Sequence, residues 1–150
     1  MSSSARPIII LLVEDSPDDV FFFGRAIRKT GLAAETHVAA DGLEAMEYLR
    51  KRGRFSDAAA FPAADIIFLD LKLPHCNGFE LMDWMRREAE FPLTPVVVLT
   101  SSSQAEDQER AEALGAALFL TKPATPEQLL DVLRKFPLPR LQAAGRENAD

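Results

Sequence analysis

The sequence has little cysteine, no long apolar run and no apolar leader. Cys76 is the only cysteine among the 150 residues, which rules out a disulfide within the chain and fits a reducing compartment. The longest apolar run, Ile8–Val13, is far below the ~20 residues that a membrane-spanning helix needs. The opening letters MSSSARP lack the apolar core of a secretion signal. We therefore expect a cytoplasmic protein without a membrane partner.

Positive charge is also scarce. The chain has 17 Lys and Arg against 23 Asp and Glu, which gives a formal net charge of -6. Because binding to a phosphate backbone depends on clustered Lys and Arg, this balance argues against a nucleic-acid partner. What the chain does have is apolar residues, 47% of the total, enough for the core of one globular domain.

Short apolar runs alternate with amphipathic stretches along the chain. Such alternation predicts a doubly wound α/β fold, with parallel strands joined by right-handed crossovers and helices on both faces of the sheet. Pro17 with the acids after it marks one helix start, and Gly31 is a natural stop. The expected strands are 8–13, 35–40, 66–69, 95–100 and 117–120. The expected helices are 17–30, 42–51, 79–90, 103–114 and 126–136.

The remaining segments are assigned by their lack of such a pattern. Residues 54–64 are expected to form a surface loop, and 137–150 a tail without an output domain. We expect residues 1–7 to form an N-terminal tail and 8–136 the single domain. On the helix 42–51 we expect three apolar side chains to share one face, those of Leu43, Met46 and Leu49.

Polar side chains follow four of the expected strands directly. In a doubly wound sheet, ligands bind outside the carboxyl ends of the strands, so these side chains are expected at one rim. Each alone is more often a helix cap, a turn residue or a solvated charge, and only their joint placement indicates a site. The residues at this rim are Glu14, Asp15, Asp70, Thr100, Ser101 and Lys122.

Three crowded carboxylates repel one another and require a cation. Oxygen ligands are those that Mg²⁺ prefers, and such an ion attracts a phosphoryl oxygen. Lys122 adds a positive charge suited to a phosphate oxygen, and Thr100 adds a hydroxyl. A carboxylate at Asp70 in these surroundings is equipped to accept a phosphoryl group as an acyl phosphate.

Five segments together resemble the response-regulator receiver domain of two-component signalling. They are LLVEDSPDD, DGLEAMEYL, IIFLDLKLPHCNGFEL, PVVVLTSSS and ALGAALFLTKP, and the resemblance covers 8–136. It implies the flavodoxin-like (βα)5 receiver fold, with five parallel strands. The finer similarity is to small stand-alone receivers that serve bacterial phytochromes and related histidine kinases, supported by the long segment before residue 66 and the EDSPDD start.

The resemblance assigns a role to each residue of the rim. It implies that Asp70 is the phosphoacceptor and that Mg²⁺, or Mn²⁺, binds Glu14, Asp15, Asp70 and the backbone carbonyl of Lys72. Lys122 contacts the phosphoryl group, and the bond to Pro123 is cis. Thr100, with Ser101 beside it, is the switch hydroxyl.

A switch aromatic on the last strand is implied as well. It is Phe119 here, which lacks the hydroxyl of the more usual tyrosine. The implied output is a repacked face of the fourth helix, fifth strand and fifth helix. That face signals through a partner, through a homodimer, or not at all if the protein is a phosphate sink.

The segment Val20-Phe21-Phe22-Phe23 has more apolar residues than one core stripe can use. Val20, Phe23 and Ile27 share that stripe. One interpretation places Phe22 at the core boundary and leaves Phe21 exposed. The other makes Phe21 and Phe22 a docking face for a histidine kinase or phosphotransfer protein, because aromatic residues suit anchoring positions.

Three other functions compete with this one. A haloacid-dehalogenase-like phosphatase needs a second acid two positions after Asp70, where this chain has Lys72. A flavin or nucleotide binder needs a phosphate loop after the first strand, where Glu14 and Asp15 would repel phosphate. A scaffold that kept the fold without phosphorylation does not require the site residues, and all of the expected ones are present in this chain. We therefore expect a phosphoacceptor signalling protein whose only enzyme-like steps are self-phosphorylation from phosphodonors and slow autodephosphorylation.

Overall fold

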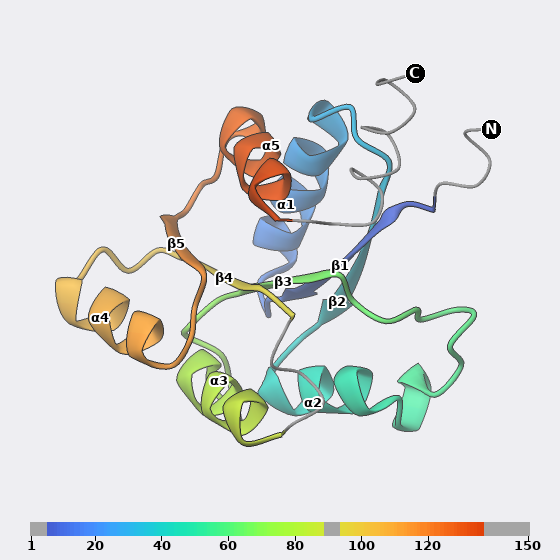
Figure 1. Ribbon diagram of the computed structural model, residues 1–150, viewed down its shortest axis with the longest axis horizontal. Helices are drawn as coiled ribbons and strands as arrows, with labels where there is room; N and C mark the ends of the chain where they lie inside the picture. The colour runs from blue at the N-terminus through green and yellow to red at the C-terminus, as the bar shows by residue number, and fades with distance from the viewer. Residues whose placement is uncertain (1–5, 89–93, 137–150) are drawn as a thin grey trace.

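The structure is a computed structural model that describes residues 6–88 and 94–136. Strands and helices alternate along the chain, and one short 3-10 helix follows the second helix (Figure 1). The strands are β1 (Ile8–Val13), β2 (Ala34–Ala39), β3 (Ile66–Leu69), β4 (Val96–Thr100) and β5 (Leu118–Thr121). The helices are α1 (Pro17–Lys29), α2 (Gly42–Arg50), the 3-10 helix η2 (Gly53–Phe55), α3 (Gly78–Arg87), α4 (Ala105–Ala113) and α5 (Pro126–Lys135).

All five strands pair in parallel in one sheet of order β2-β1-β3-β4-β5. Helices α1 and α5 cover one face, and α2, α3 and α4 lie on the other (Figure 1). The predicted doubly wound parallel fold is confirmed. Its order reverses at β1, so the carboxyl ends of β1 and β3 open between the two helix layers, where ligands bind in such sheets.

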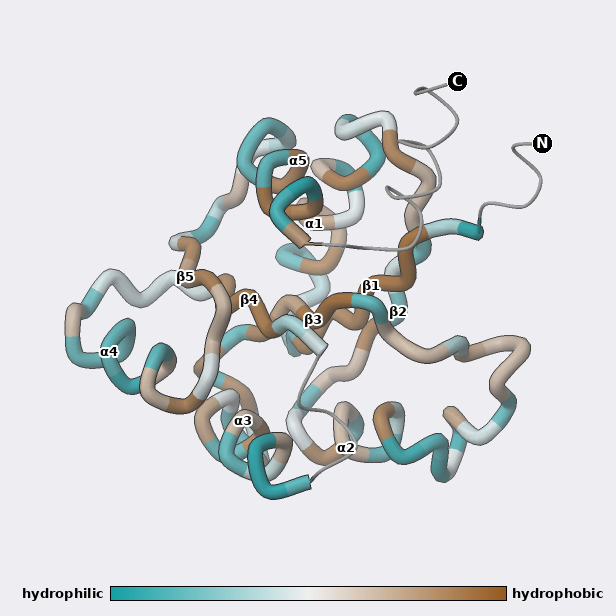
Figure 2. The backbone as a smooth tube through the Cα atoms, in the orientation of Figure 1, coloured by the Kyte–Doolittle hydropathy of each residue, from teal (hydrophilic) through white to brown (hydrophobic). Residues whose placement is uncertain are grey.

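The central strands are buried on both faces, as their unbroken apolar runs predict. Every residue of β1, β3 and β4 is buried, and in Figure 2 these strands form the hydrophobic band between the helix layers. Alternate side chains feed two separate cores. Leu11, Val13 and Ile67 pack under α2 and α3, while Ile10 and Phe68 pack under α1 and α5. The edge strand β2 is only partly buried.

The helices begin where side chains can cap them. Ser16 Oγ accepts from the Asp19 amide before α1, and Asp41 Oδ1 accepts from the Glu44 amide before α2. Asn77 forms a reciprocal capping box with Glu80, which moves the start of α3 to Gly78. These local hydrogen bonds explain why all five predicted helix starts differ from the structure by two residues or fewer.

Two details of the prediction were wrong. Of the three side chains predicted to share a face of α2, Met46 and Leu49 pack against the core, but Leu43 is 53% exposed, and the fully buried side chains of α2 are those of Ala45 and Tyr48. The segment after α2 is not only a surface loop, since it begins with η2 and buries Phe55 completely. Phe55 is buried although its neighbours in the sequence are polar, because burial of its ring removes a large apolar area from water.

Several predicted boundaries also shift. The predicted start of α4 at residue 103 moves to Ala105, because Ser102 Oγ accepts from the Gln104 amide and donates to Asp107 Oδ2. The last predicted residues of α3, the expected tail 137–150 and most of the expected tail 1–7 lie outside the described residues. Among the described residues, none of the helices is both long and apolar enough to cross a membrane.

Candidate functional site

Parallel pairing brings the predicted acids to one end of the sheet. Glu14 follows β1 and Asp70 follows β3, and the backbone amide of each continues the ladder, to Ala39 and Val13 respectively. Glu14 is 4% exposed and Asp70 8% exposed, so both carboxylates lie largely out of water. Burial of two acids this close together is costly unless a cation lies between them.

The three predicted metal ligands form one group. Carboxylate oxygens of Glu14, Asp15 and Asp70 lie within 4.8 Å of one another. Asp15 is exposed beside the two buried acids, so the group opens to solvent on one side. A hard divalent cation takes carboxylate oxygens and keeps some of its waters, and this donor set fits such an ion.

Lys122, the residue after β5, places its ammonium among the acids. Nζ lies 2.5 Å from Glu14 Oε1, 2.8 Å from Asp70 Oδ2 and 2.8 Å from Asp19 Oδ2. Its backbone amide donates to the Thr100 carbonyl at 2.8 Å, which extends the pairing of β5 with β4. One lysine therefore joins β1, β3 and the first turn of α1.

The pKa values show how strongly these charges depend on one another. Burial alone would lower the pKa of Lys122, but hydrogen bonds to Asp19, Asp70 and Glu14 outweigh it and raise the pKa above the ordinary value. Burial raises the pKa of Glu14, and contact with Lys122 offsets this only in part. Desolvated acids held next to an ammonium are an arrangement that functional sites use to position charge.

The hydroxyl residues lie at the end of β4. Thr100 is completely buried, and its Oγ1 accepts from the Ser102 amide at 3.4 Å. Ser101 is exposed. The described structure gives no contact between either hydroxyl and Asp70, so it places both at the rim without joining them to the acids. Ser102, which is buried and holds the β4–α4 connection, was not singled out from sequence.

The other predicted residues surround this group. The Lys72 amide donates to Asp70 Oδ1 at 3.3 Å, which fixes the carboxylate against the connection after β3. The Lys122–Pro123 peptide bond is cis. Phe119 is partly buried and packs with the core under α3 and α4, whereas its neighbours Leu118 and Leu120 pack under α1 and α5.

The two candidate docking residues lie on the outer face of α1. Phe21 is 58% exposed and Phe22 is 55% exposed, with ring centroids 5.7 Å apart in an edge-to-face arrangement. Phe22 also lines a small hollow with Leu12, Leu99 and Lys122. Phe23 and Ile27 are buried in the predicted stripe, and Val20 packs at its border.

Asp19 is the site residue that sequence reasoning missed. It was assigned only to the first turn of α1, where acids are favoured anyway. A signal was available in its spacing, since an acid at the third position of a helix that follows Glu14 and Asp15 returns toward the strand end. Its contact with Lys122 spans 103 positions and depends on the tertiary structure.

Comparison with known proteins gives a consistent picture. The profile of the response regulator receiver domain matches residues 10–134. Response regulator Rcp1 of Synechocystis sp. is 30% identical over 131 residues, 87% of each chain. Its Mn²⁺-bound form has a TM-score of 0.71 at 30% identity, with 86% of this chain and 91% of that one covered.

Two phytochrome response regulators are also similar in structure. The phosphorylated cyanobacterial RcpA is 30% identical with a TM-score of 0.76, covering 89% of this chain and 99% of that one. The bacteriophytochrome response regulator AtBRR is 35% identical with a TM-score of 0.76, covering 86% and 91%. With a five-stranded parallel sheet and an acidic group at its carboxyl end, this chain belongs to the response regulator receiver domain family.

Proposed function

We propose that this receiver accepts a phosphoryl group on Asp70 from a histidine kinase. The observation that carries the proposal is the Asp70 carboxylate, hydrogen-bonded to Lys122 at 2.8 Å and grouped with Glu14 and Asp15. A carboxylate that is desolvated yet positioned next to a cation can act as a nucleophile while the cation stabilises charge on the incoming group.

The transfer follows from these groups. A carboxylate oxygen of Asp70 forms a bond to phosphorus, and the bond from phosphorus to the kinase's histidine nitrogen breaks. The imidazole leaves with the electron pair of that bond. Lys122 stabilises charge on the transferring oxygens, which is the main contribution a protein makes to phosphoryl transfer. Water later attacks phosphorus, which releases phosphate and restores the carboxylate.

A divalent ion fits the same site. Glu14, Asp15 and Asp70 would hold Mg²⁺ through their carboxylates, with the backbone carbonyl of Lys72 as a further ligand. When bound, the ion neutralises the acids and draws phosphoryl oxygens toward the site. The Mn²⁺-bound form of Rcp1 supports a divalent ion in this chain as well.

The output would be a conformational change that begins at Thr100 and Phe119. A phosphoryl group on Asp70 gains a hydrogen bond from the Thr100 hydroxyl, with Ser101 beside it, and Phe119 moves further into its pocket. That movement repacks the face formed by α4, β5 and α5. A local change of charge thereby selects between two packings. The output is a partner protein or a homodimer formed through this face.

The partner would be a histidine kinase, such as one of phytochrome type, or a phosphotransfer protein. RcpA and AtBRR are phytochrome response regulators, which supports this class of partner. Phe21 and Phe22 form the docking face on α1, because exposed aromatic pairs anchor protein interfaces. We further propose residues 8–136 as the receiver domain, with tails 1–7 and 137–150, and a cytoplasmic location without nucleic-acid or membrane partners.

The test is incubation with acetyl phosphate and Mg²⁺, followed by intact-mass measurement. The wild type is expected to gain the mass of one phosphoryl group, and the Asp70→Asn variant is expected to gain none. Chelation of the metal with EDTA should abolish the gain. A wild type that takes up no phosphoryl group, from acetyl phosphate or from phosphohistidine donors, would instead favour a non-phosphorylated scaffold.

A further inference from the structure

The outer face of α1 carries a stripe of four exposed side chains. They are spaced i, i+3, i+4 and i+7, which places them on one side of the helix: Asp18, Phe21, Phe22 and Arg25. The buried residues of α1 lie on the opposite side, so this stripe points away from the sheet. Two large apolar side chains exposed side by side are typical of a surface that a partner covers.

The two charged residues of the stripe lack a partner within the described chain. The side chains of Asp18 and Arg25 form no hydrogen bond or ion pair with residues 6–88 and 94–136. The helix dipole favours an acid in the first turn, but Arg25 lies before the last turn of α1 and gains little from it. The stripe therefore has a free acid at one end, a free cation at the other and two phenyl rings between them.

Such a stripe is complementary to a second copy of itself. The point midway between Phe21 and Phe22 lies about 5 Å along the helix axis from Asp18 and equally far from Arg25 in the other direction. Two antiparallel copies of α1 that cross at this point bring Asp18 of each copy to Arg25 of the other, with the phenyl rings meeting between them. A parallel pair would instead place like charges opposite one another. An interface with two-fold symmetry requires this kind of self-complementary surface.

We propose that the stripe is a homodimer interface, in which α1 of one copy lies antiparallel to α1 of a second copy. Exposed ion pairs contribute little affinity, so the phenyl rings supply the main driving force and the charges set the orientation. One helix from each copy buries less than the ~1,200 Å² of a standard stable interface. The dimer is therefore weak, and its population depends on protein concentration.

The charges of α1 favour a second copy over a lipid surface. Anionic headgroups attract cations but repel the acid at the other end of the stripe, Asp18. Arg28 and Lys29 lie in the last turn, about 10 Å from the crossing point. The helix dipole favours cations there without any partner, so these two residues do not indicate a membrane.

The dimer would compete with the histidine kinase. Phe21 and Phe22 also form the proposed docking face, so a kinase that docks there must separate the two copies. This consequence rests on the proposed function, whereas self-association itself requires no phosphoryl group. By linkage, the apparent affinity for the kinase falls as the concentration of the receiver rises.

The first experiment is sedimentation equilibrium of the full chain without a phosphodonor, between about 10 μM and about 1 mM protein. The wild type should show a reversible monomer–dimer equilibrium in this range. Asp18→Arg and Arg25→Asp each place like charges opposite one another, so each should weaken the association about threefold or more. The two substitutions together exchange the charges and should restore the wild-type affinity. Glu106→Arg is the matched control and should associate as the wild type does, because it also reverses an exposed acid in the first turn of a helix, α4.

A second experiment tests the antiparallel orientation by disulfide cross-linking. The background is Cys76→Ala, which removes the one native cysteine. Asp18→Cys and Arg25→Cys variants are mixed and oxidised, and they should cross-link to each other faster than either does to itself. The two copies of position 18 lie about 10 Å apart along the axis, which is beyond the reach of a disulfide.

Three results would overturn the inference. They are a wild type that stays monomeric over the whole range, an Asp18→Arg variant that associates as the wild type does, and a double variant no tighter than the single ones. Preferential cross-linking of Asp18→Cys to itself would also overturn it. Binding to vesicles of anionic phospholipid without self-association would assign the stripe to a lipid surface instead. Failure of the proposed function is seen separately, as a wild type that takes up no phosphoryl group from acetyl phosphate.

Discussion

Two lysines in this protein lie in opposite surroundings. Lys122 lies among the carboxylates of Glu14, Asp19 and Asp70. Lys51, which ends α2 in a left-handed conformation, has no carboxylate partner among residues 6–88 and 94–136. Its Nζ instead donates to the Phe61 carbonyl and lies 4.3 Å from the centre of the Tyr48 ring.

The pKa values of the two lysines shift in opposite directions. Hydrogen bonds to acids outweigh burial and raise the pKa of Lys122, whereas burial without an acid lowers the pKa of Lys51. In the proposed function, Lys122 lies where negative charge changes during transfer, whereas Lys51 holds the connection after α2 in place. The comparison shows that a charged side chain near the core is not by itself a sign of chemistry.

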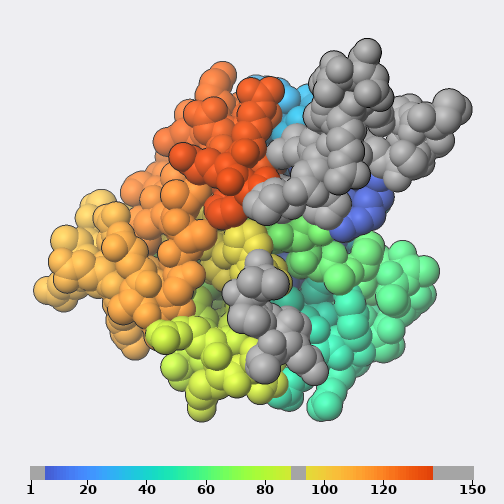
Figure 3. All heavy atoms as spheres, viewed as in Figure 1, coloured from blue at the N-terminus to red at the C-terminus, as the bar shows by residue number. Residues whose placement is uncertain are grey.

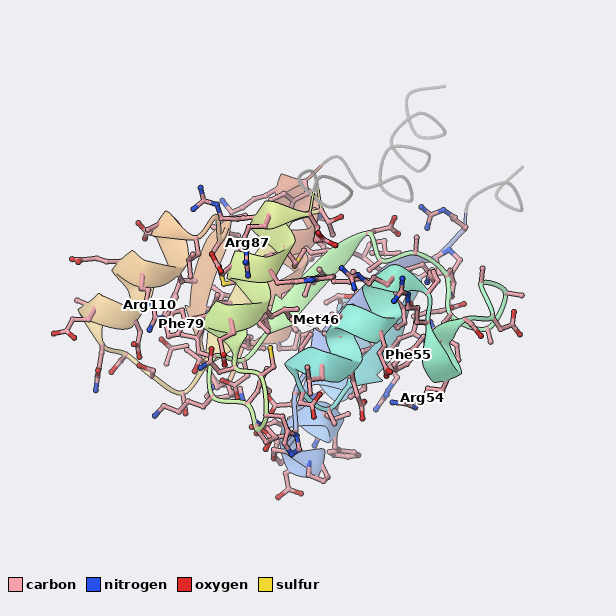
Figure 4. All side chains as sticks on the ribbon, turned by 90° about the horizontal axis from the view of Figure 1, so that it is seen from below. Met46, Arg54, Phe55, Phe79, Arg87 and Arg110 are labelled. Atoms are coloured by element: carbon pink, nitrogen blue, oxygen red, sulfur yellow. The ribbon has the colours of Figure 1, made fainter. Side chains whose placement is uncertain are left out.

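The region around Lys51 is an aromatic cluster on one flank of the molecule, on the opposite side from α4 (Figure 3). Phe55 stacks edge-to-face on Phe61 at 5.0 Å and lies 5.2 Å from Tyr48, while Arg54 covers its ring at 4.3 Å. Figure 4 shows Arg54 and Phe55 beside α2. Tyr48 Oη donates to the Pro62 carbonyl at 2.5 Å. We expect substitutions in this cluster to change the free energy of unfolding, and substitutions at the rim to change the rate of phosphorylation.

The largest effect on stability is expected from Phe55→Ala. Phe55 is completely buried, so its loss removes apolar burial and leaves a cavity, at a cost of about 3–5 kcal/mol in the free energy of unfolding. Urea titration measures this loss, and Phe21→Ala, at an exposed position, is the matched control. Phosphorylation of Asp70 by acetyl phosphate should remain near the wild-type rate under folding conditions. A large loss of rate in the folded variant would contradict the separation of the two regions.

Lys122→Met should have the largest effect on transfer. The variant keeps much of the side-chain length but loses the ammonium that, in the proposed function, stabilises the transferring oxygens. We expect the rate of phosphorylation by acetyl phosphate to fall about 100-fold, as for removal of other transition-state donors. Intact-mass time courses measure the rate. Lys51→Met is the matched control and should react at the wild-type rate, so equal losses in both variants would remove the distinction between the lysines.

Tyr48→Phe tests the cluster with a smaller change. It deletes only the hydroxyl that donates to the Pro62 carbonyl, and we expect a loss of about 1 kcal/mol in the free energy of unfolding. Chemical denaturation is again the measurement. An unchanged stability would show that the hydroxyl is satisfied equally well by water in the unfolded chain.

The smallest expected effect is a pH dependence from Lys51. Its folded pKa lies below the ordinary value of 10.5, so between the two values the unfolded chain binds more protons. At lower pH the buried charge of Lys51 therefore lowers the free energy of unfolding, and this penalty decreases as the pH rises toward 10.5. The stability of the wild type relative to Lys51→Met should rise as the pH approaches 10.5 from below. Tyr48, whose pKa burial raises to about 12, remains in both variants and largely cancels in the difference. A falling difference would contradict the assignment.

The rim residues could be predicted because they follow apolar runs directly in sequence. Asp70 comes after Ile66–Leu69, and Lys122 comes after β5, so the strand order alone brings them to one edge. Asp19 and Ser102 could not be found in this way. Both depend on how α1 and the connection after β4 pack; the position of Asp19 in the first turn after Glu14 and Asp15 indicated only the side of the sheet, not its contact with Lys122.

The same limit appears on α2. The spacing of its apolar residues predicted that Leu43, Met46 and Leu49 share a face, and Leu43 is exposed in the structure. In the structure the Tyr48 side chain is buried, because its ring packs against Phe55 and Phe61 from the following segment. Those partners lie in a stretch that has no regular pattern.

By itself the sequence determined the alternation of strands and helices, the parallel sheet and the acids at its carboxyl edge. These follow from local apolar runs, caps and turns, which are read from neighbouring residues. Only the tertiary structure decided that Lys122 would have Asp19 as a third carboxylate partner and that Lys51 would have none in the described part of the chain. A lysine's surroundings are set by residues far away in the chain, and their approach is fixed only when the helices pack on the sheet.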